Sequence, residues 1–285
     1  MRVLILGISG MLGSRVFRTI SENAKLEVYG TLRGAELLSN FQPEQHARII
    51  TSLDVLNTAK LKEVISEIRP EIIINCVGLV KQLGSSKEPL VALPLNSMMP
   101  HQLVRMAADA GARVIHISTD CVFSGKKGQY IESDISDAED LYGRSKYIGE
   151  LNEFENAVTL RTSIIGHELS TNKSLVDWFL SQETKVKGFR KAIFSGLPTI
   201  ELAQVIEKFV IPNVDLKGLY HVSAAAINKF ELLNLVAEVY EKKIEIVPDD
   251  ELVIDRSLNS SRFAAATGYK APAWPELIKK MYHSR

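Results

Sequence analysis

The 285-residue sequence has few cysteines, no excess of charge of one sign and no long apolar run. Its only two cysteines, Cys76 and Cys121, lie in or beside apolar runs, so no disulfide framework of a secreted protein is expected. Lys and Arg number 34, as do Asp and Glu, which argues against binding to nucleic acid or to an anionic membrane. A small-molecule partner is therefore favoured.

Segments that would direct the chain to a membrane or bind a metal are also missing from the sequence. No stretch approaches the roughly 20 apolar residues that a membrane helix needs. The apolar run before Gly7 is shorter than the core of a signal peptide, so we expect a cytoplasmic protein. His101, His167 and His221 show no metal-ligand spacing, and no metal site is predicted.

Short β-branched runs alternate with longer helix-like segments through the first half of the chain. The segments expected to be strands are 3–6, 27–29, 48–50, 72–76, 114–118 and 157–160. The segments expected to be helices are 11–21, 58–68, 90–110 and 140–154. This alternation predicts repeated βαβ units and an α/β fold with a Rossmann-like, doubly wound parallel sheet.

The pattern becomes less regular after residue 160. It predicts loops around 166–173 and 187–198, and helices near 201–210 and 229–241. We expect residues 1–160 to form mainly an NAD(P)-binding domain, and residues 161–285 to form a smaller substrate-binding lobe that interleaves with it. Such a lobe would cover the carboxyl edge of the sheet, where open α/β sheets bind their ligands.

Three glycines, Gly7, Gly10 and Gly13, stand between the first expected strand and the first expected helix. Glycine lets the backbone turn sharply and approach a pyrophosphate, whose charge then meets free N–H groups at the start of a helix. The context favours dinucleotide binding over an ordinary tight turn. The candidate cofactor contacts of this loop are Gly7, Ser9, Gly10, Met11, Leu12 and Gly13.

The end of the second expected strand bears on the choice of cofactor. NAD-binding sites usually have a carboxylate there for the ribose 2′-hydroxyl. This sequence has Arg33 instead, whose guanidinium suits a 2′-phosphate, so NADPH is favoured and NADH remains an alternative. After the third strand, Asp54 and Val55 are candidate adenine contacts, although Asp54 would serve equally well as a helix N-cap.

A possible proton-transfer pair follows the fifth expected strand. That strand ends in Ser118 and Thr119, and Tyr142 and Lys146 lie four residues apart at the start of a helical segment, where they share one face. A neighbouring ammonium lowers the pKa of a phenol and makes it a usable acid or base. His116 within the strand is expected to be a hydrogen-bonded structural residue.

Together these motifs resemble the extended short-chain dehydrogenase/reductase superfamily and, more narrowly, the dTDP-4-dehydrorhamnose reductase family, essentially from end to end. The segments that carry the resemblance are Gly7–Gly13, Asn75–Gly78, Asn96–Pro100, Ser118–Gly125, Tyr142–Glu150, Leu160–Ser163, Gly196–Thr199 and Arg256–Arg262.

The resemblance implies roles for the catalytic residues. Thr119 would bind the substrate carbonyl, Tyr142 would donate the proton, and Lys146 would bind the nicotinamide ribose and tune Tyr142. Asp120 and Cys121 are implied substrate contacts, and Cys121 departs from the tyrosine that the family often has there. The related 4,6-dehydratases have a glutamate base after Thr-Asp, so Cys121 argues for ketone reduction over dehydration.

Further candidates lie in expected loops. Val77–Gly78 and Lys81 follow the fourth strand, where a cofactor or substrate loop belongs, although Lys81 could be simply solvated. Arg161 would reach a diphosphate or form a buried ion pair. Arg256 and Arg262 flank a polar segment and are candidates to clamp the diphosphate of a nucleotide sugar.

The expected activity is NADPH-dependent reduction of the 4-keto group of a nucleotide-linked 4-keto-6-deoxyhexose, in deoxysugar and cell-surface polysaccharide synthesis. A UDP-linked 2-acetamido-2,6-dideoxy-4-ketohexose is an alternative substrate. A nucleotide-sugar epimerase and a non-catalytic NADP-binding regulatory subunit are alternative functions, since fold alone does not establish activity. A homodimer is compatible with the sequence.

Overall fold

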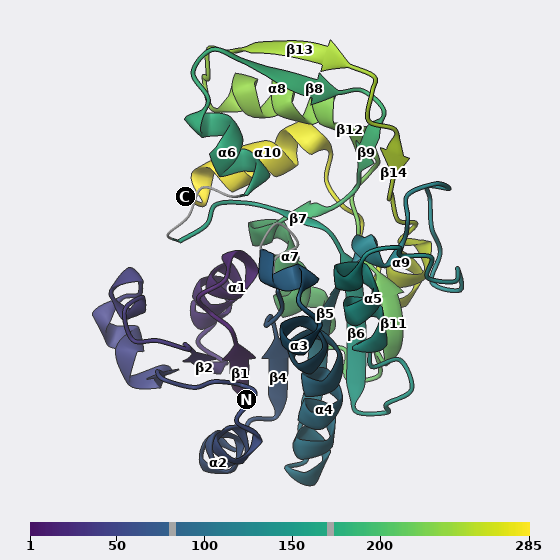
Figure 1. The fold of residues 1–285 in the computed structure, drawn as a ribbon. Helices are drawn as coiled ribbons and strands as arrows, with labels where there is room; N and C mark the ends of the chain where they lie inside the picture. The colour runs from purple at the N-terminus through teal and green to yellow at the C-terminus, as the bar shows by residue number, and fades with distance from the viewer. Residues whose placement is uncertain (80–83, 170–173) are drawn as a thin grey trace.

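A computed structural model describes residues 1–79, 84–169 and 174–285 of the chain. The lower part in Figure 1 is a parallel sheet flanked by helices, and the upper part is a smaller lobe of helices and short strands. No helix in the described ranges combines the length and apolar composition needed to span a bilayer.

Seven parallel strands form the main sheet in the order β11-β6-β5-β4-β1-β2-β3. Their bounds are β1 Arg2–Leu6, β2 Glu27–Thr31, β3 Ile49–Ile50, β4 Ile72–Asn75, β5 Arg113–Thr119, β6 Ala157–Thr162 and β11 Gly218–His221. The strand order reverses at β1, which pairs with β2 on one side and with β4 on the other. This switch point is where doubly wound sheets bind nucleotides, and it confirms the predicted Rossmann-like fold.

Both faces of the sheet are buried. Val3 and Ile5 of β1 pack with α1 residues in one apolar cluster, and Leu4 and Leu6 pack with α2 and α4 residues in another. All four side chains are fully buried, because alternate residues of a strand point to opposite faces of the sheet.

The helices of the first half lie close to their predicted positions. Both α1 (Met11–Ser21) and α2 (Thr58–Ile68) have the predicted bounds. The single predicted helix over 90–110 is a succession of α3 (Pro89–Ala92), a π-helical stretch (Leu93–Met98) and α4 (Met99–Asp109).

The predicted helix over 140–154 is shorter in the structure, where α5 spans Leu141–Ile148. Asp140 caps its start by accepting a hydrogen bond from the Gly143 amide at 2.8 Å. Gly149 ends the helix at a close approach to the preceding helical segment, because a Cβ there would lie 1.9 Å from the Asn96 carbonyl oxygen.

The C-terminal lobe contains strands that the sequence pattern missed. The predicted loop over 187–198 is wrong: β8 (Lys185–Phe189), β9 (Ala192–Phe194) and β10 (Leu197–Pro198) occupy most of it. Their partners are β13 (Glu245–Asp249) for β8, β12 (Ile227–Asn228) and β14 (Ile254–Asp255) for β9, and β7 (Ile164–Ile165) for β10. These strands are too short for alternation to reveal them, and pairing with distant segments stabilises them.

The lobe and the sheet half are interleaved. Strand β11 lies at the edge of the main sheet, and α7 (Thr199–Val205) packs against α1. The remaining helices of this half are α6 (Leu175–Ser181), α8 (Lys229–Val239), α9 (Ser261–Thr267) and α10 (Trp274–His283).

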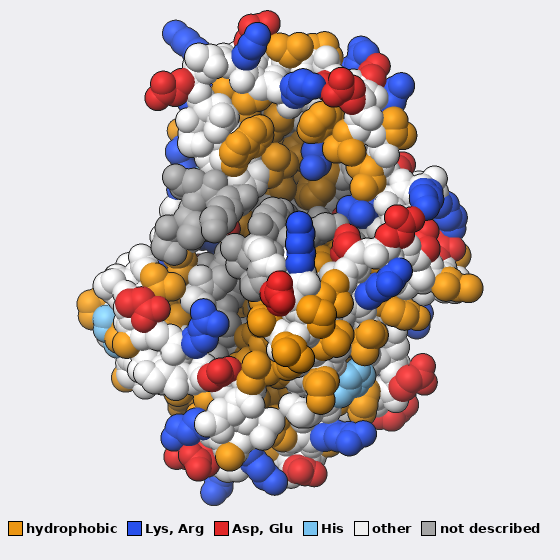
Figure 2. Space-filling model, in the orientation of Figure 1, with side chains coloured by type: hydrophobic (Ala, Val, Ile, Leu, Met, Phe, Trp, Pro, Cys, Tyr) orange, Lys and Arg blue, Asp and Glu red, His pale blue; other side chains and the backbone are white. Residues whose placement is uncertain are grey.

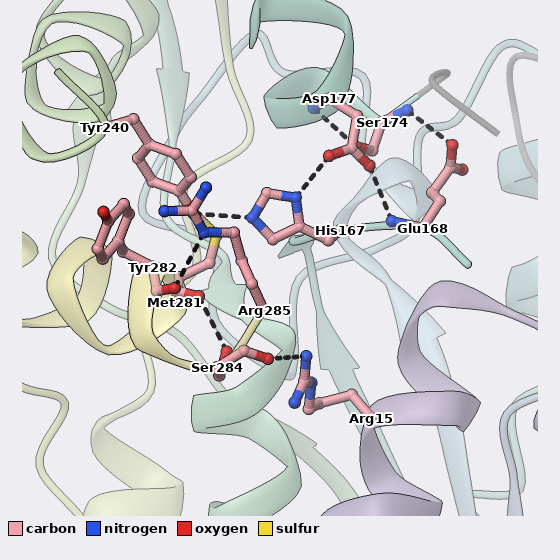
Figure 3. Close-up of polar contacts among 10 residues, drawn as sticks. All are labelled: Arg15, His167, Glu168, Ser174, Asp177, Tyr240, Met281, Tyr282, Ser284 and Arg285. Carbon is pink, nitrogen blue, oxygen red and sulfur yellow. Dashed lines mark hydrogen bonds and ion pairs between the residues drawn. The ribbon is translucent and has the colours of Figure 1, made fainter. Parts of the chain in front are cut away.

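Figure 3 shows two groups of polar contacts. One lies within the lobe and centres on His167, and the other joins the C-terminus to α1. The His167 Nδ1 lies 2.5 Å from the Asp177 carboxylate of α6, and its Nε2 lies 2.8 Å from the Tyr240 hydroxyl at the end of α8. At the C-terminus, the Ser284 carbonyl accepts a hydrogen bond from Arg15 of α1. The end of the chain is thereby attached to the first helix of the sheet half.

Candidate active site

The glycine loop after β1 has the backbone geometry expected of a phosphate-binding turn. Gly7 has a φ of +83°, a left-handed conformation that favours glycine. A Cβ on Gly13 would lie 2.1 Å from the Gly7 carbonyl oxygen, so only glycine permits this close approach of helix and turn. Gly10 is the N-cap of α1 and supplies no side-chain hydrogen bond to the first turn. The amide groups at the start of α1 thus suit an anionic group.

The next two strands end near the same edge of the sheet. Arg33 is exposed two residues beyond β2, as expected of a side chain free to meet a phosphate. Asp54 is exposed and accepts a hydrogen bond from the Leu56 amide at 3.0 Å. The helix-cap alternative for Asp54 is wrong, because Asn57 caps α2 by accepting from the Lys60 amide. Val55 is buried in the core beneath them.

The exit of β4 faces both the glycine loop and the predicted catalytic lysine. A Cβ on Gly7 would lie 2.8 Å from Val77 Cγ2, and a Cβ on Gly78 would lie 3.6 Å from Lys146 Nζ. The structure therefore brings Gly7, Val77, Gly78 and Lys146 together at the switch point. Lys81 lies outside the described residues.

Thr119 and Tyr142 lie together at the carboxyl end of β5. Thr119 is the last residue of β5, and its hydroxyl accepts a hydrogen bond from the Cys121 amide at 3.1 Å. The same hydroxyl interacts with the phenol of Tyr142, which is in the first turn of α5. A carbonyl oxygen placed between two such hydroxyls would be polarised by both.

The predicted lowering of the Tyr142 pKa by Lys146 is wrong for this structure. Burial raises the pKa of Tyr142 above its usual value, and the nearby Cys121 raises it further, while the Thr119 contact opposes the rise. The Lys146 ammonium instead donates a hydrogen bond to the Ile117 carbonyl at 2.8 Å. Tyr142 is accordingly a protonated phenol near neutral pH, the form that a proton donor requires.

Lys146 is almost completely buried, with 5% of its surface exposed. Burial lowers its pKa to about 8, and the carboxylate of Glu150 opposes that shift. The ammonium form therefore still predominates at neutral pH. The positive charge of Lys146 therefore lies beside the β4 exit.

Asn96 is a site residue to which the sequence pattern assigned no role. Its side chain is buried, accepts a hydrogen bond from the Leu79 amide at 3.1 Å and donates one to the Ser145 hydroxyl at 3.0 Å. It thus connects the β4 exit to the helix that carries Tyr142 and Lys146. The signal available in the sequence was an asparagine among apolar residues of an expected helix, because such a side chain needs hydrogen-bond partners when it is buried.

His116 is the structural histidine that the sequence predicts. It is fully buried in β5, and its Nδ1 lies 3.0 Å from the Asn75 side-chain amide. Burial keeps the pKa of His116 well below its usual value, so the ring is neutral. The Asn75 side chain also accepts a hydrogen bond from the Val77 amide at 3.1 Å and so helps to fix the β4 exit.

Arg161 forms a buried ion pair, which is one of the two roles that the sequence left open for it. Its guanidinium is 1% exposed and donates two hydrogen bonds to the Glu150 carboxylate, at 2.6 and 2.7 Å. Ser118 donates to the same carboxylate at 2.7 Å, and the remaining arginine nitrogen lies 3.3 Å from His221 Nε2. The fork of Arg161 is therefore occupied within the protein.

Among the other substrate candidates, Cys121 and Arg256 interact with Asp120, which directly follows Thr119, whereas Arg262 lies over the Tyr220 ring. Burial raises the pKa of the Asp120 carboxyl, while Arg256 and hydrogen bonds from Cys121, Thr119 and Ser163 oppose the rise. The Nε–H of Arg256 donates a hydrogen bond to the Phe123 carbonyl at 2.7 Å. Arg262 is exposed on α9, with its guanidinium 4.8 Å from the centre of the Tyr220 ring.

Figure 2 shows that the molecule is hollowed between the lobe and the sheet half, with Lys and Arg side chains among hydrophobic ones in the walls. The described residues contain no cluster of three or more His, Cys, Asp or Glu side chains suited to a metal. The hydroxyls of Thr119 and Tyr142 can polarise a carbonyl, and the Tyr142 phenol can donate a proton to it.

Known proteins with similar sequences include enzymes and a subunit of an enzyme. The chain is 25% identical to a dTDP-4-dehydrorhamnose reductase of Aggregatibacter actinomycetemcomitans, with 98% of each chain covered. It is 27% identical to the methionine adenosyltransferase 2 subunit beta of Xenopus laevis, over 84% of this chain and 72% of that protein.

Solved structures share the whole fold. A dTDP-4-dehydrorhamnose reductase from Bacillus anthracis, in complex with NADP, superposes with a TM-score of 0.81 at 23% identity over 100% of this chain and 98% of that chain. A hypothetical dTDP-4-dehydrorhamnose reductase from Sulfolobus tokodaii gives a TM-score of 0.78 at 27% identity, covering 96% and 98%.

A family model agrees with these similarities. The model of the RmlD substrate binding domain matches residues 1–284 of the chain. This protein therefore belongs to the RmlD substrate binding domain family, together with dTDP-4-dehydrorhamnose reductases.

Proposed function

We propose that this protein uses NADPH to reduce the 4-keto group of a nucleotide-linked 4-keto-6-deoxyhexose. The observation that carries the proposal is the meeting of Thr119, Tyr142 and Lys146 beside the glycine loop at the switch point of the sheet. Membership of a family that includes dTDP-4-dehydrorhamnose reductases supports the same conclusion.

The residues at the switch point fit a dinucleotide. The glycine loop has no room for a Cβ at Gly13 and presents the first amides of α1 to a pyrophosphate. Arg33 is available for a 2′-phosphate, which favours NADPH over NADH. When bound, NADPH supplies the hydride that reduces the sugar carbonyl carbon.

The chain supplies the proton and holds the reacting oxygen. Thr119 and Tyr142 donate hydrogen bonds to the C4 carbonyl oxygen, and they stabilise the negative charge that grows on it during reduction. The Tyr142 hydroxyl then gives its proton to this oxygen, so that the ketone becomes an alcohol and the tyrosine a phenolate. The Lys146 ammonium, which donates a hydrogen bond to the Ile117 carbonyl beside the β4 exit, would hold the nicotinamide ribose.

The nucleotide and the substituent at sugar C2 define the substrate further. A dTDP-linked sugar without nitrogen is the first choice, because the reductase relatives act in that class by name. Cys121 replaces a bulkier family residue beside Asp120, which supports a UDP-linked 2-acetamido-2,6-dideoxy-4-ketohexose as the second choice.

The direct test is to measure NADPH oxidation with a panel of dTDP-, UDP- and GDP-linked 4-keto-6-deoxy sugars. We expect stoichiometric conversion of one class to the alcohol and turnover about a hundredfold slower, or slower still, by Tyr142→Phe. An epimerase would convert a nucleotide sugar without net NADPH consumption. If no sugar of the panel is consumed while NADPH still binds, the reductase proposal fails.

A regulatory subunit is the second candidate function. Similarity to the beta subunit of methionine adenosyltransferase 2 supports it. Under this alternative the chain would bind NADPH and a partner enzyme without turnover. The retained Thr119, Tyr142 and Lys146 side chains, placed together as described, favour catalysis.

A further inference from the structure

The hydrogen bond between His116 and Asn75 fixes the position of the proton on the histidine ring. His116 is fully buried, and its Nδ1 lies 3.0 Å from the side-chain Nδ2 of Asn75. An amide nitrogen only donates, so Nδ1 accepts, and the single proton of the neutral ring is on Nε2. The Nε2 atom has no hydrogen-bond partner among the described residues. A buried donor without a partner lowers stability, so stability alone does not explain a histidine at this position.

Asn75, the last residue of β4, uses both ends of its side-chain amide. Its Oδ1 accepts a hydrogen bond from the Val77 amide at 3.1 Å, and its Nδ2 donates to His116. If the amide were turned by half a rotation, its Nδ2 would face the Val77 N–H and its Oδ1 would face the His116 Nδ1. Two donors would then oppose each other at one end and two acceptors at the other. His116 therefore holds Asn75 in the orientation that binds Val77.

The β4 exit lies between the glycine loop and the proposed catalytic lysine. In the paired strands β1 and β4, Asn75 lies beside the residue that precedes Gly7. A Cβ on Gly7 would lie 2.8 Å from Val77 Cγ2, so Val77 packs directly against the turn. A Cβ on Gly78 would lie 3.6 Å from Lys146 Nζ. The hydrogen bond to the Val77 amide therefore fixes a segment that contacts both parts of the proposed dinucleotide site.

A second buried polar side chain lies next to His116 on the same face of the sheet. Thr159 of β6 is in register with His116 and is fully buried. Its hydroxyl accepts a hydrogen bond from the Leu151 amide at 2.9 Å, beyond the end of α5. The two neighbours thus hold different segments, and of these two only His116 is connected to the β4 exit.

We propose that His116 is a positioning residue for the dinucleotide, and that it acts by orienting Asn75 so that the β4 exit is held against the glycine loop. This inference rests on the dinucleotide binding of the reductase function proposed above. Because His116 acts through Asn75 and Val77, its loss should weaken NADPH binding, beyond any effect on stability.

The test is fluorescence titration of the purified variants with NADPH, together with denaturant unfolding. His116→Leu leaves the Asn75 amide without its acceptor and should weaken NADPH binding about tenfold, because the orientation that binds Val77 is no longer enforced. His116→Asn should restore most of the affinity, since an asparagine Oδ1 takes about the place of the histidine Nδ1. The smaller side chain leaves a cavity and lowers stability. A purely structural role therefore predicts weak binding by His116→Asn, whereas a positioning role predicts recovered binding.

Thr159→Val is the matched control, because it removes a buried hydrogen-bond acceptor from the same face of the sheet. It should lower stability and keep the wild-type affinity for NADPH. Nitrogen NMR of the imidazole rings tests the tautomer: the signals that His116→Asn lacks should belong to a neutral ring with its proton on Nε2.

Three results would overturn this inference while the reductase proposal stands. They are a proton on Nδ1 of His116, wild-type NADPH affinity in His116→Leu, and an equal loss of affinity in His116→Leu and Thr159→Val. If the wild type binds no NADPH at all, the inference and the reductase proposal are both overturned.

Discussion

Most neighbours in the main sheet are successive strands of the chain, apart from β1–β4 and β6–β11, whereas every strand pair of the lobe joins strands with other strands between them in the sequence. In the main sheet β1 pairs with β2, β4 with β5, and β5 with β6. In the lobe β8 pairs with β13, and β9 pairs with both β12 and β14. The half that carries the proposed chemistry is therefore built mainly from repeated strand–helix units, while the strands of the half proposed to hold the substrate pair without such a repeat.

This difference assigns separate tasks to the two regions. The glycine loop, Thr119 and Tyr142 lie at strand ends or helix starts of the sheet half, and Lys146 lies in the last turn of α5. Arg256 follows β14 and Arg262 lies on α9, both in the lobe. Substitutions in the first group should alter turnover or cofactor binding, and substitutions in the second group should alter substrate affinity.

The largest effect is expected in the interior of the sheet half. Glu150→Gln should lower the free energy of unfolding by about 3–5 kcal/mol, because the Arg161 charge would remain buried without its partner. Denaturant unfolding measures this, and Glu63→Gln is the matched control, since Glu63 forms an exposed pair with Lys60 that is worth under about 1 kcal/mol. Equal losses in both variants would refute the structural role of the buried pair.

The next prediction concerns turnover. Tyr142→Phe should lower kcat by about two orders of magnitude, the usual contribution of a positioned general acid, and leave NADPH affinity unchanged. The phenylalanine ring keeps the packing and removes only the hydroxyl. Lys146→Met should instead weaken NADPH binding as well as turnover, because its ammonium is proposed to hold the ribose. Wild-type turnover by Tyr142→Phe would show that another group donates the proton.

The main sheet could be predicted from the sequence, and the strands of the lobe could not. The glycine spacing and the alternation of strands and helices predicted the sheet, with α1 and α2 at their observed bounds. These patterns are local, so periodicity and turn residues reveal them. The strands β8, β9 and β10 were missed because they are short and pair with segments that no local pattern identifies.

The candidate site shows the same limit. Spacing predicted that Tyr142 and Lys146 would share a helix face, but burial, which raises the pKa of Tyr142, depends on the packing of the whole site. Arg161 was compatible with two environments, and only the fold shows its pairing with Glu150.

A smaller effect is expected from the lobe. Arg256→Ala should raise the KM for the nucleotide sugar about tenfold and change kcat little, because a diphosphate contact remote from C4 stabilises the ground state and the transition state alike. Arg262→Ala is the comparison, since its guanidinium lies over Tyr220 and its effect should be weaker. Steady-state kinetics with the identified sugar measures both. A loss confined to kcat would place Arg256 in the chemistry and break the division of tasks.

An effect of similar size is expected at the outer end of the cofactor site. Arg33 is exposed after β2, so solvent would screen an ion pair between its guanidinium and a 2′-phosphate. We expect Arg33→Asp to shift the preference for NADPH over NADH by roughly tenfold. The ratio of kcat/KM values for the two cofactors measures it, with Lys62→Asp on exposed α2 as the control for charge alone. Raising the salt concentration should reduce the wild-type preference, because the interaction is electrostatic. If the unmodified protein uses both cofactors equally well, Arg33 does not select the phosphate. The sheet half would then bind the dinucleotide through the glycine loop and the β4 exit, without discrimination at the ribose.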